Sequence, residues 1–365
     1  SPCVNQNIVL NNGTVIRNLG DIGTRWNIDA QLEHINRYFD YGINIQKGNI
    51  VIDIGANIGI FSLMACDMCC GEISVYAFEP VFATYCDLEK NIEGLSSCIQ
   101  AYNFGISDKE KEIAITHYPN APGLSTLYPD GMVNATTKMI NNLDENVNDL
   151  PEFFKGYRER EENRERSNKI RTIWGLKTLF ESKKIPCRVV PLSKFIKKKQ
   201  LDIVHLLKVD TNGSELDVLN GINEEDYRKI NQIVIETPLD SENYLTIKKK
   251  LSANGFVIMQ EAPQEPVINS GLIYTIIYAV NEKQVYKSIK QILVHDIFSK
   301  YIKDIDISAT ENIDHYLDSM QILRVISEIE KKFNILLDER MATESIGSLD
   351  DICNILAQHK RSETL

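Results

Sequence analysis

The chain has 365 residues, a formal net charge of -11 and 43% hydrophobic residues, so it can bury a large core and exceeds one typical small domain. The acidic balance argues against nucleic acid as a partner. No apolar run approaches the roughly 20 residues that a membrane helix needs, and the amino terminus has no signal-peptide pattern. We therefore expect two domains in a soluble, cytoplasmic protein with no nucleic-acid or membrane partner.

Residues 51–61, with the sequence VIDIGANIGIF, predict a buried strand, a tight turn and the start of a helix. Gly55 and Gly59 stand where the backbone has to turn sharply beside a ligand, and Asn57 is suited to capping the helix. The spacing differs from the Gly-x-Gly-x-x-Gly fingerprint of dinucleotide sites, so a pyrophosphate would fit poorly. Asp53, near the strand end, is suited to a cationic ligand, and we expect an S-adenosylmethionine site.

A second strand is predicted at residues 73–78 and ends at Glu79, whose carboxylate can accept both hydroxyl hydrogens of a ribose. Nicotinamide-binding folds also carry an acid at this point, so Glu79 alone does not decide between the two cofactors. A third strand, at residues 99–104, leads to a Gly-Ile-Ser-Asp turn where an adenine edge can be recognised. The predicted cofactor-binding residues are Asp53, Gly55, Asn57, Gly59, Glu79, Pro80, Ile106, Ser107 and Asp108.

Three cysteines, Cys66, Cys69 and Cys70, lie in the helix predicted after the glycine turn. No second Cys or His pair follows at a spacing typical of zinc sites. We expect these cysteines to pack in the core as small hydrophobic side chains.

Strands that alternate with helices build a parallel sheet, with ligands at the carboxyl ends of its strands. Five motifs, VIDIGANIGIFS, YAFEP, FGISD, LLKVDTNGSELDVL and QIVIETP, resemble the FkbM family of S-adenosylmethionine-dependent methyltransferases. The resemblance covers roughly residues 48–280. It implies an α/β, class I (Rossmann-like) fold with seven mostly parallel strands, the last antiparallel, and usually methyl transfer to oxygen. The chain departs from the family at Thr211 and Asn212, where a hydrophobic residue and Glu more often precede the glycine.

The alternation of strands and helices breaks between residues 131 and 184. A run of mixed charge at residues 157–166 lies in this segment. Mixed signs along a helix are typical of a solvated face, whereas long insertions near strand ends commonly act as lids. We expect a helical insertion and leave both interpretations open.

Two acidic residues, Asp210 and Glu236, follow the next two predicted strands, and we expect both to face the cofactor's methyl group. Lys208 shares a strand face with Asp210. An alcohol accepts a methyl group once its hydroxyl loses its proton or binds a metal. Asp210 and Glu236 can hold Mg²⁺, because this cation prefers oxygen ligands. Otherwise a side chain acts as the base, and His117, before a PGLST loop, is the best placed of the 6 histidines.

The chain changes from strand to helix after Val280. An amphipathic helix is predicted at 285–302, a second begins at the sequence LDSM and runs to Phe333, and a last one covers 349–356. This tail resembles an acyl or peptidyl carrier protein, which implies a 4′-phosphopantetheine arm on Ser319. The alternative is a small helical dimerisation module, because Asp and Ser cap helices in any case.

We therefore expect a methyltransferase at residues 1–281 and an acyl carrier protein domain at residues 282–365. Together they indicate an O-methyltransferase acting on a carrier-tethered polyketide or peptide intermediate, from a polyketide synthase or hybrid polyketide/nonribosomal peptide module. The tether would raise the effective concentration of the acyl substrate. The implied partners are a phosphopantetheinyl transferase and neighbouring assembly-line domains. An N- or C-methyltransferase, an inactive methyltransferase-like scaffold and a nicotinamide-dependent oxidoreductase are the alternatives.

Overall fold

The structure, a computed structural model, describes residues 8–9, 15–16, 34–120, 122–130, 181–239, 242–264, 273–302, 313–337 and 347–364. The insertion predicted at residues 131–184 falls outside these ranges except for residues 181–184, which lead into a strand. Within the described ranges, no helix is both long and apolar enough to cross a bilayer.

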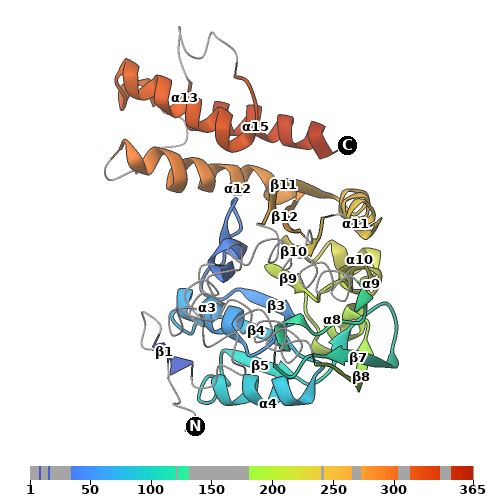
Figure 1. Cartoon of the computed structure of the whole chain (residues 1–365). Helices are drawn as coiled ribbons and strands as arrows, with labels where there is room; N and C mark the ends of the chain where they lie inside the picture. Colours follow the sequence, from blue (N-terminus) through green and yellow to red (C-terminus); the bar gives the residue numbers. More distant parts are fainter. Residues whose placement is uncertain are drawn as a thin grey trace, which may run out of the picture.

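A seven-stranded sheet forms the centre of the methyltransferase region (Figure 1). Its order is β11-β12-β10-β9-β3-β4-β5, and β12 runs antiparallel to both of its neighbours. This topology confirms the Rossmann-like class I methyltransferase fold. The strands are β3 (Ile50–Ile54), β4 (Ser74–Phe78), β5 (Ile99–Tyr102), β9 (Leu206–Asp210), β10 (Gln232–Pro238), β11 (Phe256–Pro263) and β12 (Tyr274–Asn281).

Helices cover both faces of this sheet, because its central strands carry buried apolar side chains on either side. Along β10, Val234 packs into one core, whereas Ile233 and Ile235 pack into the other. The covering helices are α3 (Ile60–Met68) and α4 (Phe82–Asn91) on the first face, and α8 (Leu192–Lys199), α9 (Glu215–Asn220), α10 (Glu224–Tyr227) and α11 (Glu242–Ala253) on the second.

A three-stranded sheet lies beside the main sheet. Its order is β6-β8-β7, with β8 parallel to β6 and antiparallel to β7. Its strands are β6 (Gly105–Ile106), β7 (Lys111–His117) and β8 (Lys183–Val190). A two-stranded sheet pairs β1 (Ile8–Val9) with β2 (Val15–Ile16), and short 3₁₀ turns occur at η1 (Arg37–Phe39), η2 (Pro122–Leu124), η5 (Glu282–Gln284) and η8 (Ile313–His315).

The carboxy-terminal helices extend the first of the two cores. Figure 1 shows α12 between the sheet and the pair α13 and α15. Ile289, Ile329 and Leu356, one from each helix, belong to the same buried apolar cluster as Val257 of β11. Because the carboxy-terminal helices share this cluster with the sheet, the division into two domains at residue 281 stays a prediction. The helices are α12 (Val285–Ile292), continued by η6 (Leu293–Ile297) in π-helical form and η7 (Phe298–Lys300), α13 (Ser319–Phe333) and α15 (Leu349–Thr364).

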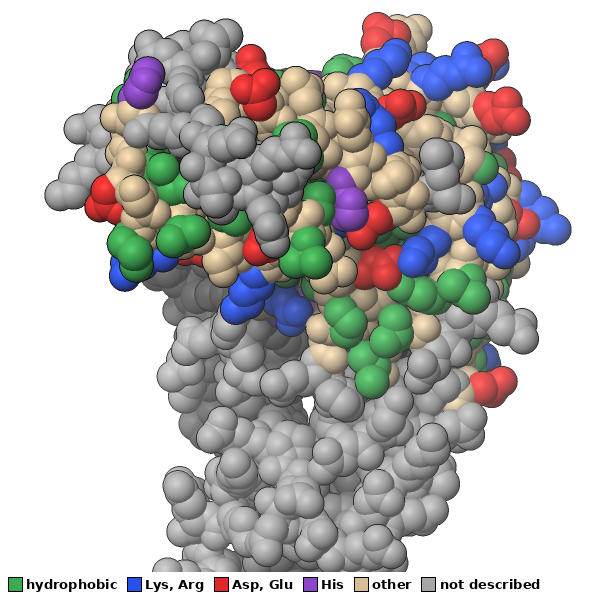
Figure 2. All heavy atoms as spheres, turned by 90° about the horizontal axis from the view of Figure 1, so that it is seen from above, with side chains coloured by type: hydrophobic (Ala, Val, Ile, Leu, Met, Phe, Trp, Pro, Cys, Tyr) green, Lys and Arg blue, Asp and Glu red, His purple; other side chains and the backbone are tan. Residues whose placement is uncertain are grey.

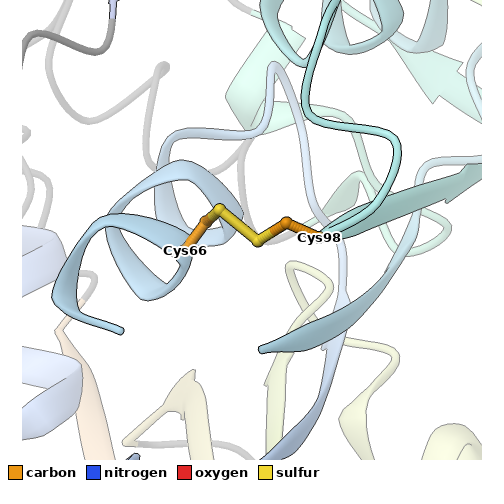
Figure 3. Close-up of a disulfide and its surroundings, with 2 residues drawn as sticks. All are labelled: Cys66 and Cys98. Atoms are coloured by element: carbon orange, nitrogen blue, oxygen red, sulfur yellow. A yellow bond between two sulfur atoms is a disulfide. The ribbon is translucent and has the colours of Figure 1, made fainter. Parts of the chain in front are cut away.

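A disulfide joins Cys66 of α3 to Cys98, at the entrance of β5 (Figure 3). The expectation that Cys66 packs as an unbonded side chain is therefore wrong. Cys69 is buried as predicted, but Cys70 is exposed. The spacing of cysteines gives no sign of the pairing, because the two partners are separated by 32 residues and meet only when the sheet forms.

Candidate active site

The turn after β3 requires glycine at two positions. Gly55 and Gly59 have φ angles of 75° and 90°, in the left-handed region that favours glycine. A Cβ atom on Gly55 would lie 1.8 Å from the main-chain oxygen of Asp210, and one on Gly59 would lie 2.4 Å from Leu88 Cδ1. Main-chain packing therefore requires glycine at position 55, and the left-handed backbone favours glycine at both positions, in addition to any ligand contact.

Asp53 is turned into the core. Its Oδ1 lies 3.1 Å from Nζ of Lys208, and its Oδ2 accepts a hydrogen bond of 2.7 Å from Ser62. Lys208 also donates to the main-chain oxygen of Gly55 at 3.0 Å. A buried carboxylate needs a counter-charge, and Lys208 supplies it. The expected pairing of Asp53 with a cationic ligand is thus corrected to a structural ion pair.

A cleft of about 110 Å³ opens where β3, β4 and β9 end. Its position agrees with the rule that ligands bind at the carboxyl ends of parallel strands. Of the predicted cofactor-binding residues, those that line the cleft are Gly55, Asn57, Glu79, Pro80 and Ile106, and those that do not are Asp53, Gly59, Ser107 and Asp108.

Glu79 is the acidic residue best placed for a ribose. Its two carboxylate oxygens accept hydrogen bonds from the main-chain nitrogens of Asn57 at 3.1 Å and Val81 at 2.9 Å. Burial raises the pKa of Glu79 to about 7, against the effect of these amides. Each oxygen keeps a second lone pair, and Asn57 Oδ1 is buried without a hydrogen-bond partner among the described residues. These unused acceptors fit the hydroxyl and amine donors of S-adenosylmethionine.

Ser107 and Asp108 do not line the cleft but bond to each other and to Lys111. Ser107 donates to Asp108 at 3.0 Å, and Lys111 lies 2.7 Å from the same carboxylate. The physical reason is that β6 leaves the main sheet to pair with β8, where the Ser107 amide donates to Val190. The expectation that these two side chains contact the adenine is therefore not supported, and only Ile106 lines the cleft.

His117 also lies outside the cleft lining. It ends β7, is 3% exposed, and its Nδ1 lies 3.0 Å from the hydroxyl of Ser125. Burial and the charge of Lys183 lower the pKa of His117. The structure does not bring this residue to Asp210 or Glu236, so the geometry gives no support to His117 as the base.

The loop around η2 is fastened to the segment that follows β9. The Thr126 hydroxyl donates to the main-chain oxygen of Asn212 at 2.6 Å, and the side-chain amide of Asn212 donates to the main-chain oxygen of Gly123 at 2.7 Å. Glu215 accepts hydrogen bonds from the amides of Gly213 at 2.8 Å and Thr211 at 3.2 Å. Thr211 and Asn212, where the chain departs from the family pattern, thus form part of the cleft wall, and the buried carboxylate of Glu215 holds this segment in place.

Asp210 and Glu236 lie side by side at the ends of β9 and β10, as predicted. The hydroxyl of Tyr38 lies 3.1 Å from Asp210 Oδ2 and 2.5 Å from Glu236 Oε2. His34 Nε2 lies 2.9 Å from the same oxygen of Glu236. Lys208 Nζ is 3.6 Å from Asp210, on the strand face predicted for it. Three titratable side chains, those of His34, Tyr38 and Lys208, therefore surround the two carboxylates, and Tyr38 is the bridge between them.

Sequence reasoning missed both His34 and Tyr38. A signal was available in their spacing, because residues four apart on a helix share one face.

The pKa values of Asp210 and Glu236 explain how two carboxylates can lie side by side. Burial raises the pKa of Asp210, against the charge of Lys208, whereas the hydrogen bonds from His34 and Tyr38 outweigh burial and lower the pKa of Glu236. Burial also raises the pKa of Tyr38, so its hydroxyl stays a donor.

Metal binding depends on the number of ligands that converge. Among the residues that the structure describes, no group of three or more His, Cys, Asp or Glu side chains is arranged to hold a metal ion. The predicted pair of Asp210 and Glu236 would need water or substrate to complete a Mg²⁺ site.

Ser319 is exposed at the first position of α13. The residue that caps this helix is Asp318, which accepts from the Gln321 amide at 2.8 Å, while Gln321 accepts from the Asp318 amide at 2.9 Å. Figure 2, which looks onto this end of the molecule, shows acidic, basic and hydrophobic side chains interspersed. Two exposed hydrophobic residues near Ser319 are Met320 and Leu323, at 62% and 49% exposure.

Residues 53–258 match the sequence model of the family described as "Methyltransferase FkbM domain". The chain is 30% identical over 240 residues to methyltransferase sdnD of Sordaria araneosa, covering 64% of this chain and 85% of that protein. It is 27% identical over 231 residues to the 31-O-demethyl-FK506 methyltransferase FkbM of Streptomyces tacrolimicus, covering 63% and 80%. It is also 27% identical over 212 residues to the AMB antimetabolite synthetase AmbE of Pseudomonas aeruginosa, covering 53% of this chain and 9% of the synthetase.

Proposed function

Because the chain belongs to the FkbM methyltransferase domain family and is an S-adenosylmethionine-dependent methyltransferase, we propose that it methylates a hydroxyl of a carrier-tethered polyketide or peptide intermediate. The intermediate would be held as a thioester on a phosphopantetheine arm at Ser319. The observation that carries this proposal is the Ser319 hydroxyl, which is exposed at the start of α13 and forms no hydrogen bond with the described residues.

The capping of α13 leaves the Ser319 side chain without a structural role. A serine that begins a helix commonly accepts a hydrogen bond from an amide of the first turn. Here Asp318 and Gln321 perform that role as a capping box, so Ser319 is not needed for helix stability. A phosphodiester at the first turn of a helix is also favoured by the helix dipole. The hydroxyl is thus available for a phosphopantetheinyl transferase.

The names of two relatives support the two parts of the proposal. The relative from Streptomyces tacrolimicus is named for 31-O-demethyl-FK506, so its methyl group goes to an oxygen. AmbE is named a synthetase, and the similarity covers 9% of it, so a related segment occurs within a much longer chain. We infer the same setting for this chain, with neighbouring assembly-line domains as partners.

The side chains of the cleft would bind the cofactor and orient the acceptor. S-adenosylmethionine, when bound, supplies the methyl group from a sulfonium. Glu79 has lone pairs for the ribose hydroxyls, and Asn57 Oδ1 would gain the donor that it lacks. Asp210 lines the cleft and contacts Glu236 through Tyr38, so these carboxylates are placed to orient the acceptor hydroxyl. Holding the acceptor in line with the methyl carbon accounts for much of such catalysis.

Activation of the hydroxyl by Mg²⁺ on Asp210 and Glu236 is the alternative to a side-chain base. The Tyr38 hydroxyl already bridges the two carboxylates, and the Lys208 ammonium lies 3.6 Å from Asp210. A divalent cation would have to displace the hydroxyl and would be repelled by the ammonium. The geometry therefore favours a side-chain base, and a chelator separates the two mechanisms.

The test begins by loading Ser319 with a β-hydroxyacyl-phosphopantetheine, using a phosphopantetheinyl transferase and the acyl-coenzyme A. After desalting to remove the Mg²⁺ of the loading step, S-adenosylmethionine is added with either a chelator or Mg²⁺. Mass spectrometry of the intact protein follows the arm. We expect the loaded arm to gain one methylene mass in the presence of chelator.

Two variants control this experiment. Ser319→Ala should accept no arm and no methyl group, whereas Ser327→Ala, at an exposed serine of the same helix, should behave as the parent chain does. Fragmentation of the product assigns the methyl group to oxygen, nitrogen or carbon. A chain that loads and binds cofactor but transfers no methyl group to hydroxyacyl, aminoacyl or ketoacyl arms would support the inactive scaffold instead.

A further inference from the structure

His34 is a titratable side chain that no predicted function uses. It lies in the segment before β3, behind the cleft residue Asp210 and outside the cleft lining, and its side chain is 33% exposed. Nε2 lies 2.9 Å from Glu236 Oε2 and 3.4 Å from the Tyr38 hydroxyl. In the described part of the chain, no hydrogen bond involves the other ring nitrogen, Nδ1. One nitrogen is thus held by Glu236, and the described residues make no hydrogen bond to the other.

The partner of Nε2 determines which nitrogen carries the proton. A neutral imidazole has one donor and one acceptor nitrogen, and an ionised carboxylate can only accept. Glu236 therefore selects the tautomer of His34 with hydrogen on Nε2. The lone pair then lies on Nδ1. In the Ser-His-Asp arrangement the carboxylate likewise fixes the tautomer, but there it binds Nδ1 and leaves the lone pair on Nε2.

We propose that Nδ1 of His34 accepts the proton of the acceptor hydroxyl, with Glu236 as the positioning residue that holds the ring. This inference rests on the proposed function, since it names the base of that reaction. The O–H bond of the acceptor breaks as an N–H bond forms at Nδ1, and the oxygen lone pair bonds to the methyl carbon as its bond to sulfur breaks. The imidazolium faces the Glu236 carboxylate and later releases the proton to water.

The charges around the ring support this assignment. His34 faces Glu236 from β10 and Asp210 from β9, with Tyr38 and Arg37 on its own segment. Burial would lower the pKa of His34, but the hydrogen bond and charge of Glu236 and the charge of Asp210 outweigh burial and Arg37, so the pKa is raised from 6.5. Because only the neutral ring accepts a proton, the transfer rate should rise with pH through this pKa.

The first test does not depend on turnover. Nuclear magnetic resonance of the full chain labelled with ¹⁵N-histidine reports the tautomer and the pKa of each ring, and His34→Gln assigns the His34 signals. We expect hydrogen on Nε2 and a pKa above that of an ordinary histidine. Glu236→Gln should lower the pKa of His34, whereas His295→Gln, at an exposed histidine, should leave it unchanged.

The second test uses the chain loaded at Ser319. Removal of a general base typically slows a reaction by about 100- to 10,000-fold. We expect His34→Gln to lose methyl transfer to this extent, to lose the rise of rate with pH, and to bind S-adenosylmethionine with unchanged affinity in calorimetry. His117→Gln should keep the pH profile of the parent chain.

The outcomes separate the two proposals. Hydrogen on Nδ1, or a His34→Gln chain with the parent rate and pH profile, would overturn the assignment of His34. The assignment also fails if the activity of the parent chain requires added Mg²⁺ and His34→Gln abolishes metal binding, because His34 would then be a ligand. If the parent chain transfers no methyl group to any loaded arm, the proposed function fails, and the tautomer still decides whether Glu236 prepares His34 as a base.

Discussion

The two sides of the cleft are built in different ways. On the cofactor side, Glu79 binds the amides of Asn57 and Val81, 22 and 2 residues away in the chain. On the acceptor side, Asp210 lines the cleft, and behind it Tyr38 and His34 reach Glu236 across 198 and 202 residues. The cofactor side is held by main-chain contacts within one βαβ unit, whereas the acceptor side exists only when distant segments come together. Mutations should therefore affect cofactor binding on the first side and chemistry on the second, and stability on both.

The largest effect is expected at Lys208, where the two sides meet. Lys208→Met leaves Asp53 buried without its counter-charge, and removal of one partner of a buried pair costs about 3–5 kcal/mol. Urea unfolding measures the loss.

A double variant checks the cause of this loss. Lys208→Met with Asp53→Asn removes both charges, so it should be more stable than Lys208→Met alone. If the double variant loses the sum of the two single effects, the ion pair is not what stabilises this side of the cleft.

The next largest effect is expected for Gly55→Ala. The new Cβ would lie 1.8 Å from the Asp210 oxygen at a φ of 75°, so overpacking of about 1–3 kcal/mol adds to a left-handed strain of about 1–2 kcal/mol. Gly94→Ala is the matched control, because Gly94 has a φ of 86° with nothing within 4 Å of its Cβ position. A similar unfolding free energy for both variants would show that backbone strain alone requires glycine at 55.

These residues also show how far the sequence could be interpreted. Apolar runs and glycine turns predicted the strands, and the alternation of side chains along neighbouring parallel strands predicted that Asp210 meets Glu236. Asp53 was assigned wrongly because a lysine side chain from the adjacent strand reaches it, which no local pattern contains. His34 and Tyr38 were missed because their partners belong to a strand near residue 236, and such contacts follow from the tertiary fold.

Glu79 offers a pH test of the cofactor side. Its pKa is raised from 4.5 to about 7, so the folded state favours the protonated form, and the resulting stability is present below pH 4.5 and lost as pH rises to 7. The full loss corresponds to about 3 kcal/mol. The side chain of Glu79→Gln stays neutral at every pH, so this variant should not lose that stability. The free energy of unfolding of the variant relative to the parent chain should therefore increase between pH 4.5 and 7.

Glu215 provides the control for this measurement, because burial raises its pKa to about 7 as well. Its contribution is the same in the parent chain and in Glu79→Gln, so it cancels in their difference. Parallel stability curves for the two chains between pH 4.5 and 7 would show that Glu79 keeps an ordinary pKa in the folded protein.

The smallest effect is expected for Tyr38→Phe, which removes one hydroxyl from the acceptor side. Hydrogen bonds to charged groups contribute about 1.5–3 kcal/mol, so the unfolding free energy should fall by about 2 kcal/mol. Tyr102→Phe, which removes a hydroxyl bonded to Gln100 at the surface, should change it by less than about 0.5 kcal/mol.

Tyr38→Phe also separates the two sides by function. Tyr38 does not line the cleft, so the affinity for S-adenosylmethionine should stay unchanged. Without the bridging hydroxyl, Asp210 and Glu236 repel each other more strongly. The Glu236 carboxylate, which holds the ring of His34, also loses the hydrogen bond from Tyr38. Methyl transfer should therefore fall about tenfold, a loss of about 1.4 kcal/mol in transition-state stabilisation. If instead cofactor affinity falls and the transfer rate of the saturated enzyme does not, the network of Tyr38 supports the cofactor side, and the division of the cleft into two sides is incorrect.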